Sequence, residues 1–103
     1  MNIEFGNKNL LNLYTSRKCR RPRLTEEIKR KFLMRVRSLE ASDTIYDLWN
    51  SKSLHFERLE GFKNRYSVRL NKQWRLEFDV EWEVKDKIFK KVTLLEISKH
   101  YGD

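Results

Sequence analysis

Two arginines, Arg69 and Arg75, occupy a stretch whose alternation predicts a β-hairpin. Apolar and polar residues alternate without a break from Trp74 to Glu83, and a second alternating run ends at Leu70. A loop of residues 71–73 aligns the apolar faces of the two runs and sets Arg69 directly opposite Arg75. Like charges that face each other across strands destabilise a sheet by a few tenths to about 1 kcal/mol. A phosphate bound between the arginines would turn this repulsion into attraction, so the pair is a candidate anion site.

Other groups that can transfer protons or stabilise charge lie near the same expected sheet. Glu57 stands in its first expected strand after the helices, and the C-terminal "ISKHYGD" brings Lys99, His100 and Tyr101 to the tip of the last strand. Metal-free RNA cleavage needs a base for the 2′-hydroxyl, positive charge for the phosphorane and an acid for the leaving 5′-oxygen. Glu57, His100 or Tyr101 could act as base or acid, and Lys99 would join the arginines in stabilising charge.

The same residues also fit a charge ladder exposed to solvent. Glu57, Glu77 or Asp79 could neutralise the two arginines on one face of the sheet. His100 and Tyr101 lie close to the C-terminus, where chain ends are often frayed. Residue chemistry alone therefore indicates a basic domain that binds nucleic acid and leaves catalysis open.

The distribution of charge favours a polyanionic partner. The chain carries 23 Lys and Arg against 15 Asp and Glu, a formal net charge of +8, and most of the excess lies in residues 1–42. The expected RNA- or ribosome-binding residues are basic residues of the first half and of the segment before the hairpin: Arg17, Lys18, Arg20, Arg21, Arg23, Lys29, Arg30, Arg37, Lys63 and Arg65.

Several other chemistries find no support in the sequence. His55 and His100 are far apart and Cys19 is the only cysteine, so no metal site is expected. Three glycines do not form a phosphate-binding loop, and no cofactor is expected. No apolar run approaches the length of a membrane span, and the N-terminus lacks a secretory signal, so a cytoplasmic location is expected.

The N-terminal half is expected to be mainly helical. Residues 2–5 read as a short strand, followed by a short helix that Asn7 caps and that buries Leu10, Leu11 and Tyr14. A second helix should begin after Thr25 and run to about residue 41. Its apolar stripe contains Ile28, Phe32, Val36 and Leu39, and its opposite, basic face contains Lys29, Arg30, Lys31, Arg35 and Arg37.

The C-terminal half is expected to form the sheet. A short helix from residue 42 or 43 to 49 precedes a strand at 54–59, the hairpin, a turn at 84–87 and a last strand at 91–98. The nearly continuous apolar residues of this last strand predict a central strand buried on both faces. The whole chain, residues 1–103, is therefore expected to be a single α+β domain with its helices on one face of a mainly antiparallel sheet.

The segment from Phe56 to Phe78, with "LLEIS" near the C-terminus, resembles the HigB branch of the RelE/ParE toxin superfamily. The matching positions are Phe56, Leu59 and Gly61, then "YSVR" at 66–69 and "WRLEF" at 74–78. The resemblance implies a RelE/ParE-like fold and a toxin of a type II toxin–antitoxin system. It also implies a metal-independent endoribonuclease that cuts mRNA on the 70S ribosome and is restrained by a helix-turn-helix, HigA-like antitoxin.

The resemblance assigns roles to particular residues. Arg69 and Arg75 match the sheet arginines of the family, and Glu57 falls where some members have a catalytic His. Many members end in Asp-Tyr-His, and the corresponding positions here are Lys99, His100 and Tyr101, so the acidic residue is replaced and the order of His and Tyr is exchanged.

Two alternative functions would require no catalytic residues. A ParE-like toxin would act on DNA gyrase by contact and would need no catalytic groups, and a nucleic-acid-binding module would also be non-catalytic. His100 and Tyr101 favour the ribonuclease, because an inhibitor that acts by contact has no need for proton-transfer groups.

Overall fold

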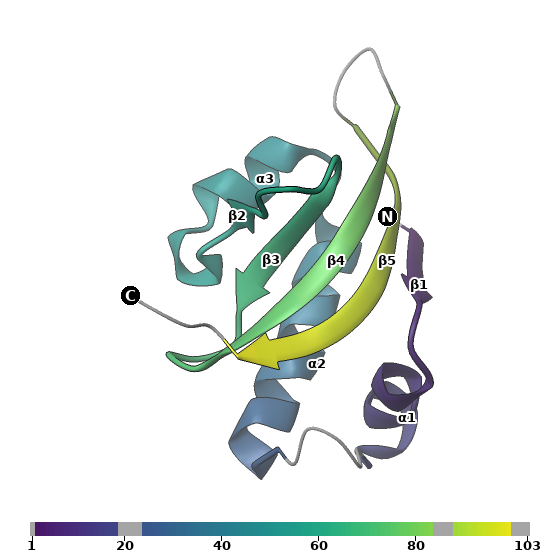
Figure 1. The fold of residues 1–103 in the computed structure, drawn as a ribbon, viewed down its shortest axis with the longest axis vertical. Coiled ribbons are helices and arrows are strands. Elements are labelled where there is room, and N and C mark those ends of the chain that lie inside the picture. The colour runs from purple at the N-terminus through teal and green to yellow at the C-terminus, as the bar shows by residue number, and fades with distance from the viewer. Residues whose placement is uncertain (1, 19–23, 84–87, 100–103) are drawn as a thin grey trace.

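The fold follows the predicted α+β order of short strand, helices and sheet (Figure 1). The computed structural model describes residues 2–18, 24–83 and 88–99. The elements are β1 (Asn2–Phe5), α1 (Lys8–Ser16), α2 (Glu26–Ala41), α3 (Ile45–Asn50), the 3-10 helix η1 (Lys52–Leu54), β2 (Glu57–Arg58), β3 (Arg65–Arg69), β4 (Trp74–Glu83) and β5 (Ile88–Lys99). The turn expected at residues 84–87 lies outside the described part of the chain.

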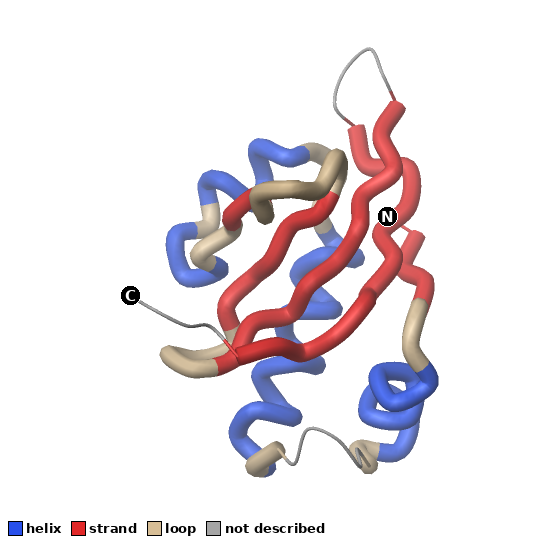
Figure 2. Tube along the Cα trace, in the orientation of Figure 1, coloured by secondary structure: helices blue, strands red, loops and turns tan. Residues whose placement is uncertain are grey.

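The sheet has the strand order β1-β5-β4-β3-β2, in which β1 pairs with β5 in parallel and the other neighbours are antiparallel. Figures 1 and 2 show α2 crossing behind the sheet, while the face turned toward the viewer carries no helix. The predicted arrangement, with helices on one face and the other face open, is confirmed.

The local signals at the helix N-termini act as expected. The Thr25 hydroxyl accepts a hydrogen bond from the Ile28 N–H at 3.3 Å, and the predicted apolar stripe of α2 is buried. Asn7 caps α1, but Leu13 is buried there while Leu11 remains 43% exposed. The next helix begins later than expected, at Ile45, because the Asp47 carboxylate accepts hydrogen bonds from the backbone N–H groups just before it.

The predicted hairpin register is confirmed. Val68 pairs with Leu76 and Arg69 pairs with Arg75 across β3 and β4. In the loop, Asn71 Oδ1 accepts hydrogen bonds from the backbone N–H groups of Gln73 and Trp74, both at 2.8 Å. This side-chain turn closes the loop and fixes which residues face each other.

The prediction that the last strand is buried on both faces is wrong. β5 is central in the sheet, between β1 and β4, but Glu96 is exposed and Leu95 is only half-buried. The register moves from Glu77 opposite Glu96 to Phe78 opposite Leu94, so Leu95 is an extra residue in a β-bulge. The bulge lets Leu94 and Ile97 both reach the core, which explains the continuous apolar run.

The strand expected at residues 54–59 is shortened to Glu57–Arg58. Leu54 is buried at the end of η1, and His55 adopts a left-handed backbone conformation with φ 45°. This conformation is incompatible with an extended strand, so β2 begins only after His55.

Candidate anion-binding site

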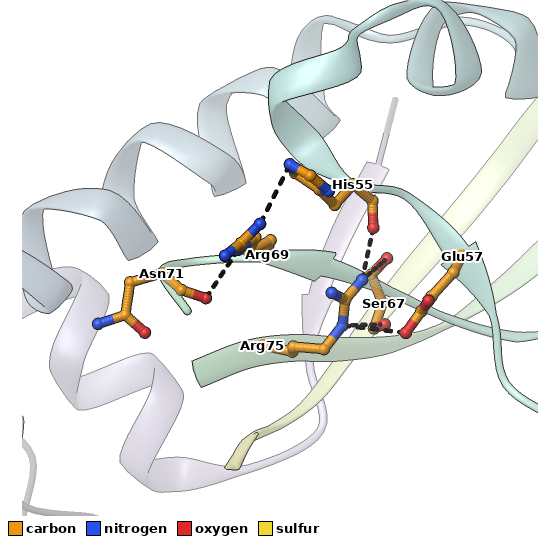
Figure 3. A network of polar contacts seen from close by, with 6 residues as sticks. All are labelled: His55, Glu57, Ser67, Arg69, Asn71 and Arg75. Carbon is orange, nitrogen blue, oxygen red and sulfur yellow. Dashed lines mark hydrogen bonds and ion pairs between the residues drawn. The ribbon is translucent and has the colours of Figure 1, made fainter. Parts of the chain in front are cut away.

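The paired arginines at the end of the β3–β4 hairpin form the centre of the candidate site (Figure 3). Both project from the open face of the sheet, because their neighbours Val68 and Leu76 point into the core. Figure 3 shows His55 and Glu57 from the segment before β3 approaching the same two guanidinium groups. Three segments of the chain therefore meet at this point.

Arg75 is buried although it carries a full charge, with only 6% of the residue exposed. Its Nε donates to the Ser67 hydroxyl at 2.8 Å, and its Nη2 donates to the backbone carbonyls of His55 and Ser67. Glu57 forms an ion pair with Arg75 at 3.3 Å. Glu57 is itself about half exposed, so water screens much of this attraction.

The electrostatics of Arg75 reflect this environment. Burial lowers the pKa of Arg75, and the charge of Arg69 lowers it further, while Glu57 and Glu77 oppose both effects. An arginine nevertheless remains protonated in a protein. The lowered pKa therefore indicates a positive charge that the fold holds at a cost and that an added anion would stabilise.

Arg69 is held through its neighbours rather than by a carboxylate. Its Nε donates to the Asn71 carbonyl at 3.1 Å, and its Nη1 lies 3.2 Å from His55 Nε2. A guanidinium can only donate, so Nε2 is the acceptor and the proton of a neutral His55 ring resides on Nδ1. Within the described part of the chain, no carboxylate forms an ion pair with Arg69, so the expected charge ladder is only partly present.

The sequence placed His55 with Glu57 at the first expected strand after the helices but assigned His55 no catalytic role. Its carbonyl accepts from Arg75 and its ring contacts Arg69, so one residue contacts both arginines. The left-handed backbone at His55 makes this possible, because it ends η1 and turns the chain toward the sheet. A non-glycine residue in this conformation often marks a functional site, but the sequence shows no glycine or turn motif that would have revealed it.

Arg35 was expected on the basic, solvent-facing side of α2, and this prediction is wrong. Its Nε donates to the Arg69 carbonyl at 2.8 Å and its Nη2 to the Ser53 carbonyl at 3.3 Å. Burial lowers the pKa of Arg35. Arg35 thus ties α2 to the two backbone segments that present Arg69 and His55.

The structure does not bring every expected catalytic residue to the arginine pair. Lys99 pairs with Trp74 and its Nζ lies 5.6 Å from the centroid of the Trp74 ring. Because side chains alternate along a strand, this is the opposite side of the sheet from Arg75. His100 and Tyr101 lie outside the described residues. Glu57 is the expected acid–base candidate that the structure places beside the pair.

The expected RNA-binding residues divide into two surfaces. Arg17, Lys18 and Arg30 are exposed near the end of α1 and the start of α2, and Arg37 is exposed farther along α2. Lys29 is paired with Glu26 at 3.4 Å. Lys63 and Arg65 lie instead at the far end of β3, beside the open face. Arg20, Arg21 and Arg23 are outside the described residues.

The part of the chain that the structure describes contains no group of His, Cys, Asp and Glu side chains that could hold a metal ion. In the same residues, no helix has the length and apolar character needed to cross a membrane. The contacts of the arginine pair offer charge stabilisation by guanidinium groups, with an imidazole and a carboxylate close by.

Comparison with known proteins agrees with this fold. The structure of the YoeB dimer from Staphylococcus aureus matches with a TM-score of 0.55 and 16% identity, over 98% of each chain, and so shares the fold. None of the curated proteins compared with the chain matches it in sequence.

The fold thus defines an α+β protein with an arginine-rich open sheet face. The family model for HigB-like toxins, described as the RelE-like toxin of the type II toxin–antitoxin system HigB, matches residues 3–90. The chain belongs to this family of HigB-like toxins. A toxin of such a system has an antitoxin partner.

Proposed function

We propose that this toxin is a ribosome-dependent endoribonuclease that cuts mRNA without a metal ion and acts in the cytoplasm. The observation that carries the proposal is the facing pair Arg69 and Arg75, whose hydrogen bonds go mainly to neutral groups. Carbonyls and a hydroxyl orient the guanidinium groups without cancelling their charge, and the half-exposed Glu57 offsets only part of the charge of Arg75. The positive charge therefore remains available to a phosphate.

In the proposed reaction the 2′-oxygen attacks the adjacent phosphorus, and the bond from phosphorus to the 5′-oxygen breaks. A base takes the 2′-hydroxyl proton, and an acid gives a proton to the departing 5′-oxygen. The products are a 2′,3′-cyclic phosphate and a 5′-hydroxyl. Arg69 and Arg75 stabilise the additional negative charge of the phosphorane, in the manner of preorganised donors around a developing charge.

His55 and Glu57 are the proposed proton carriers among the described residues. His55 Nε2 accepts from Arg69 in the free protein. When Arg69 turns to a bound phosphate, Nε2 becomes free to accept a proton, so phosphate binding would expose the base. The Glu57 carboxylate lies 3.3 Å from Arg75 Nε, so it helps to orient the guanidinium and is the second candidate for the base or the acid. The family resemblance adds His100 and Tyr101 as further candidates for the acid, and Lys99 as a more distant charge.

The proposed partners follow from the family. The antitoxin is proposed to be a HigA-like helix-turn-helix protein, and the 70S ribosome and mRNA are the proposed targets. The exposed basic residues Arg17, Lys18, Arg30 and Arg37 support contact with ribosomal RNA, because clustered positive charge favours a polyanion. The net charge of +8 supports the same conclusion.

The proposal is tested by controlled expression in bacteria of the wild type and of the Arg69→Ala/Arg75→Ala variant, with primer extension on cellular transcripts. The expected result is growth arrest with new cuts inside translated regions, lost in the variant. A Lys72→Ala/Lys90→Ala variant removes two exposed charges and should still cut. Growth arrest with intact transcripts would overturn the ribonuclease and indicate a contact target such as gyrase.

A further inference from the structure

The far end of the open sheet face carries an exposed aromatic ring stacked on a cation. Phe62 lies in the loop between β2 and β3 and is 47% exposed. The Arg65 Cζ lies 4.1 Å from the centroid of the Phe62 ring, a cation–π distance. Single exposed aromatic side chains are common on protein surfaces, so what distinguishes this ring is its contact with a cation rather than its exposure.

The cation beneath Phe62 is fixed in place. Asp79 lies directly opposite Arg65 across β3 and β4 and accepts from its Nε at 2.8 Å and its Nη2 at 3.3 Å. This two-point contact orients the plane of the guanidinium. The hydrogen bond to Asp79 raises the pKa of Arg65. The ring of Phe62 therefore rests on a rigid, planar support.

The loop that carries Phe62 is also held at both sides. The Leu59 N–H donates to the Arg65 carbonyl at 2.9 Å, and the Val80 N–H donates to the Asn64 carbonyl at 2.9 Å. Arg58 Nη2 adds a third bond, to the Lys63 carbonyl at 3.1 Å. Gly61, with φ 84°, supplies the sharp turn before Phe62. The position of the ring is thus largely preorganised.

An open cleft lies beside this stack. It has a volume of about 280 Å³ and is lined by Phe62, Lys63, Asn64, Arg65, Asp79 and Val80. The lining combines an aromatic face with hydrogen-bond donors and acceptors and an exposed lysine. This is the combination that single-stranded nucleic acid requires, because a base can stack while its phosphate meets a cation.

The cleft shares the open face with the arginine pair. Arg65, Ser67 and Arg69 alternate along β3, so all three project to the same side of the sheet. Arg65 and Arg69 are about 13 Å apart along the strand, at roughly 3.3 Å per residue. Figure 1 shows the β2–β3 loop at the end of β3 opposite to the β3–β4 turn. A short single-stranded segment would span the two positions.

We propose that the stack of Phe62 on Arg65 is a nucleobase-binding subsite for single-stranded RNA. It receives a base on the same strand whose phosphate, a short distance away, lies between Arg69 and Arg75. The inference rests on the proposed ribonuclease function for its choice of RNA. Stacking makes the subsite tolerant of sequence, since every base has an aromatic face.

The test compares two uncleavable oligonucleotides with equal numbers of phosphates, a 2′-O-methyl oligoadenylate pentamer and an abasic pentamer. Fluorescence anisotropy measures their binding to the wild type, Phe62→Leu and Phe62→Trp. We expect the wild type to prefer oligoadenylate. Phe62→Leu should weaken oligoadenylate binding about tenfold and leave the abasic ligand unchanged, and Phe62→Trp should retain the preference. Tyr46→Leu is the matched control, because Tyr46 is also an exposed aromatic, on α3.

Equal weakening of both ligands in Phe62→Leu would overturn the subsite, because the ring would then matter only for structure. So would the absence of any preference for bases in the wild type, or a loss in Tyr46→Leu as large as that in Phe62→Leu. Primer extension with ribosomes tests the ribonuclease separately. If cleavage is absent while the base preference depends on Phe62, the ribonuclease proposal fails and the subsite stands.

Discussion

Arg65 and Arg69 lie on the same strand and project from the same face of the sheet, yet they face opposite kinds of partner. Arg65 meets Asp79, which binds its guanidinium at two points. Arg69 meets Arg75, and hydrogen bonds to the carbonyls of Asn71, His55 and Ser67 and to the Ser67 hydroxyl hold these two. The one ion pair at this end, between Arg75 and Glu57, involves a carboxylate that is about half exposed. At one end of β3, Asp79 neutralises the charge of Arg65. At the other end, Arg69 and Arg75 are held in a fixed orientation and keep most of their positive charge.

This difference shows how a fold can hold two like charges together. A carboxylate between Arg69 and Arg75 would stabilise the sheet but would occupy the position of a ligand anion. Backbone carbonyls satisfy the N–H donors and leave the net charge in place. Natural proteins commonly accept such a loss of stability at functional sites.

The largest expected effect comes from replacing Arg75 by lysine. Lysine keeps the charge, but its three N–H donors sit on one nitrogen and cannot reproduce donation from the separate Nε and Nη2 atoms of the planar guanidinium. We expect ribosome-dependent cleavage to fall about 100-fold, the scale of losing one preorganised donor to a developing charge. Primer extension time courses with purified ribosomes measure the rate. Lys90→Arg, an exposed change on β5 that also keeps the charge, is the control. Wild-type cleavage by a folded Arg75→Lys protein would contradict the proposed role.

The next largest expected effect is on stability, and it concerns the hydrogen bonds by which Arg35 joins α2 to the end of the hairpin that carries the arginine pair. Arg35→Met keeps much of the apolar stem but leaves the carbonyls of Arg69 and Ser53 without their donor. We expect the free energy of unfolding to fall by about 2 kcal/mol. Urea unfolding followed by tryptophan fluorescence measures it.

Arg37→Met, an exposed neighbour on the same helix, is the matched control and should change stability by no more than about 0.5 kcal/mol. Equal losses in the two variants would mean that Arg35 contributes only general helix charge.

The features that the sequence predicts well are those set by local periodicity and by turn chemistry. The apolar stripe of α2, its Thr25 cap and the register that opposes Arg69 and Arg75 all follow from residues close in the chain. The loop closed by Asn71 is short enough that a shift by one residue would turn every side chain to the wrong face. The arginine pair was therefore predictable before the structure.

The features that the sequence does not predict depend on backbone conformation or on contacts between distant segments. The bulge at Leu95 gives β5, which buries one face, the continuous apolar sequence of a strand that is buried on both faces. The left-handed His55 converts half of an expected strand into a turn and brings its carbonyl to Arg75. Arg35 reads as one more cation on a basic helix, and only tertiary packing shows that it contacts β3.

A smaller effect is expected for the neutralised pair at the other end of β3. A double-mutant cycle with Arg65→Gln and Asp79→Asn should give an attractive coupling of about 0.5–1 kcal/mol in unfolding. The value is modest because the two side chains are 27% and 44% exposed, so water screens their attraction. Urea unfolding of the four proteins gives the coupling. A coupling of zero would mean that Asp79 does not neutralise Arg65. The proposed difference between the Arg65–Asp79 pair and the Arg69–Arg75 pair, at opposite ends of β3, would then be wrong.

The smallest expected effect has the opposite sign. A cycle with Arg69→Gln and Arg75→Gln should give a repulsive coupling of a few tenths of a kcal/mol at low salt. Hydrogen bonds made by each arginine alone cancel in the cycle, so the coupling isolates the pair. Because salt screens repulsion, the coupling should weaken between about 0.05 M and 1 M salt, though only in part, since Arg75 is buried. An attractive coupling at low salt would mean that Glu57 and His55 already bridge the two guanidinium groups, and no unbalanced charge would then remain to attract a phosphate.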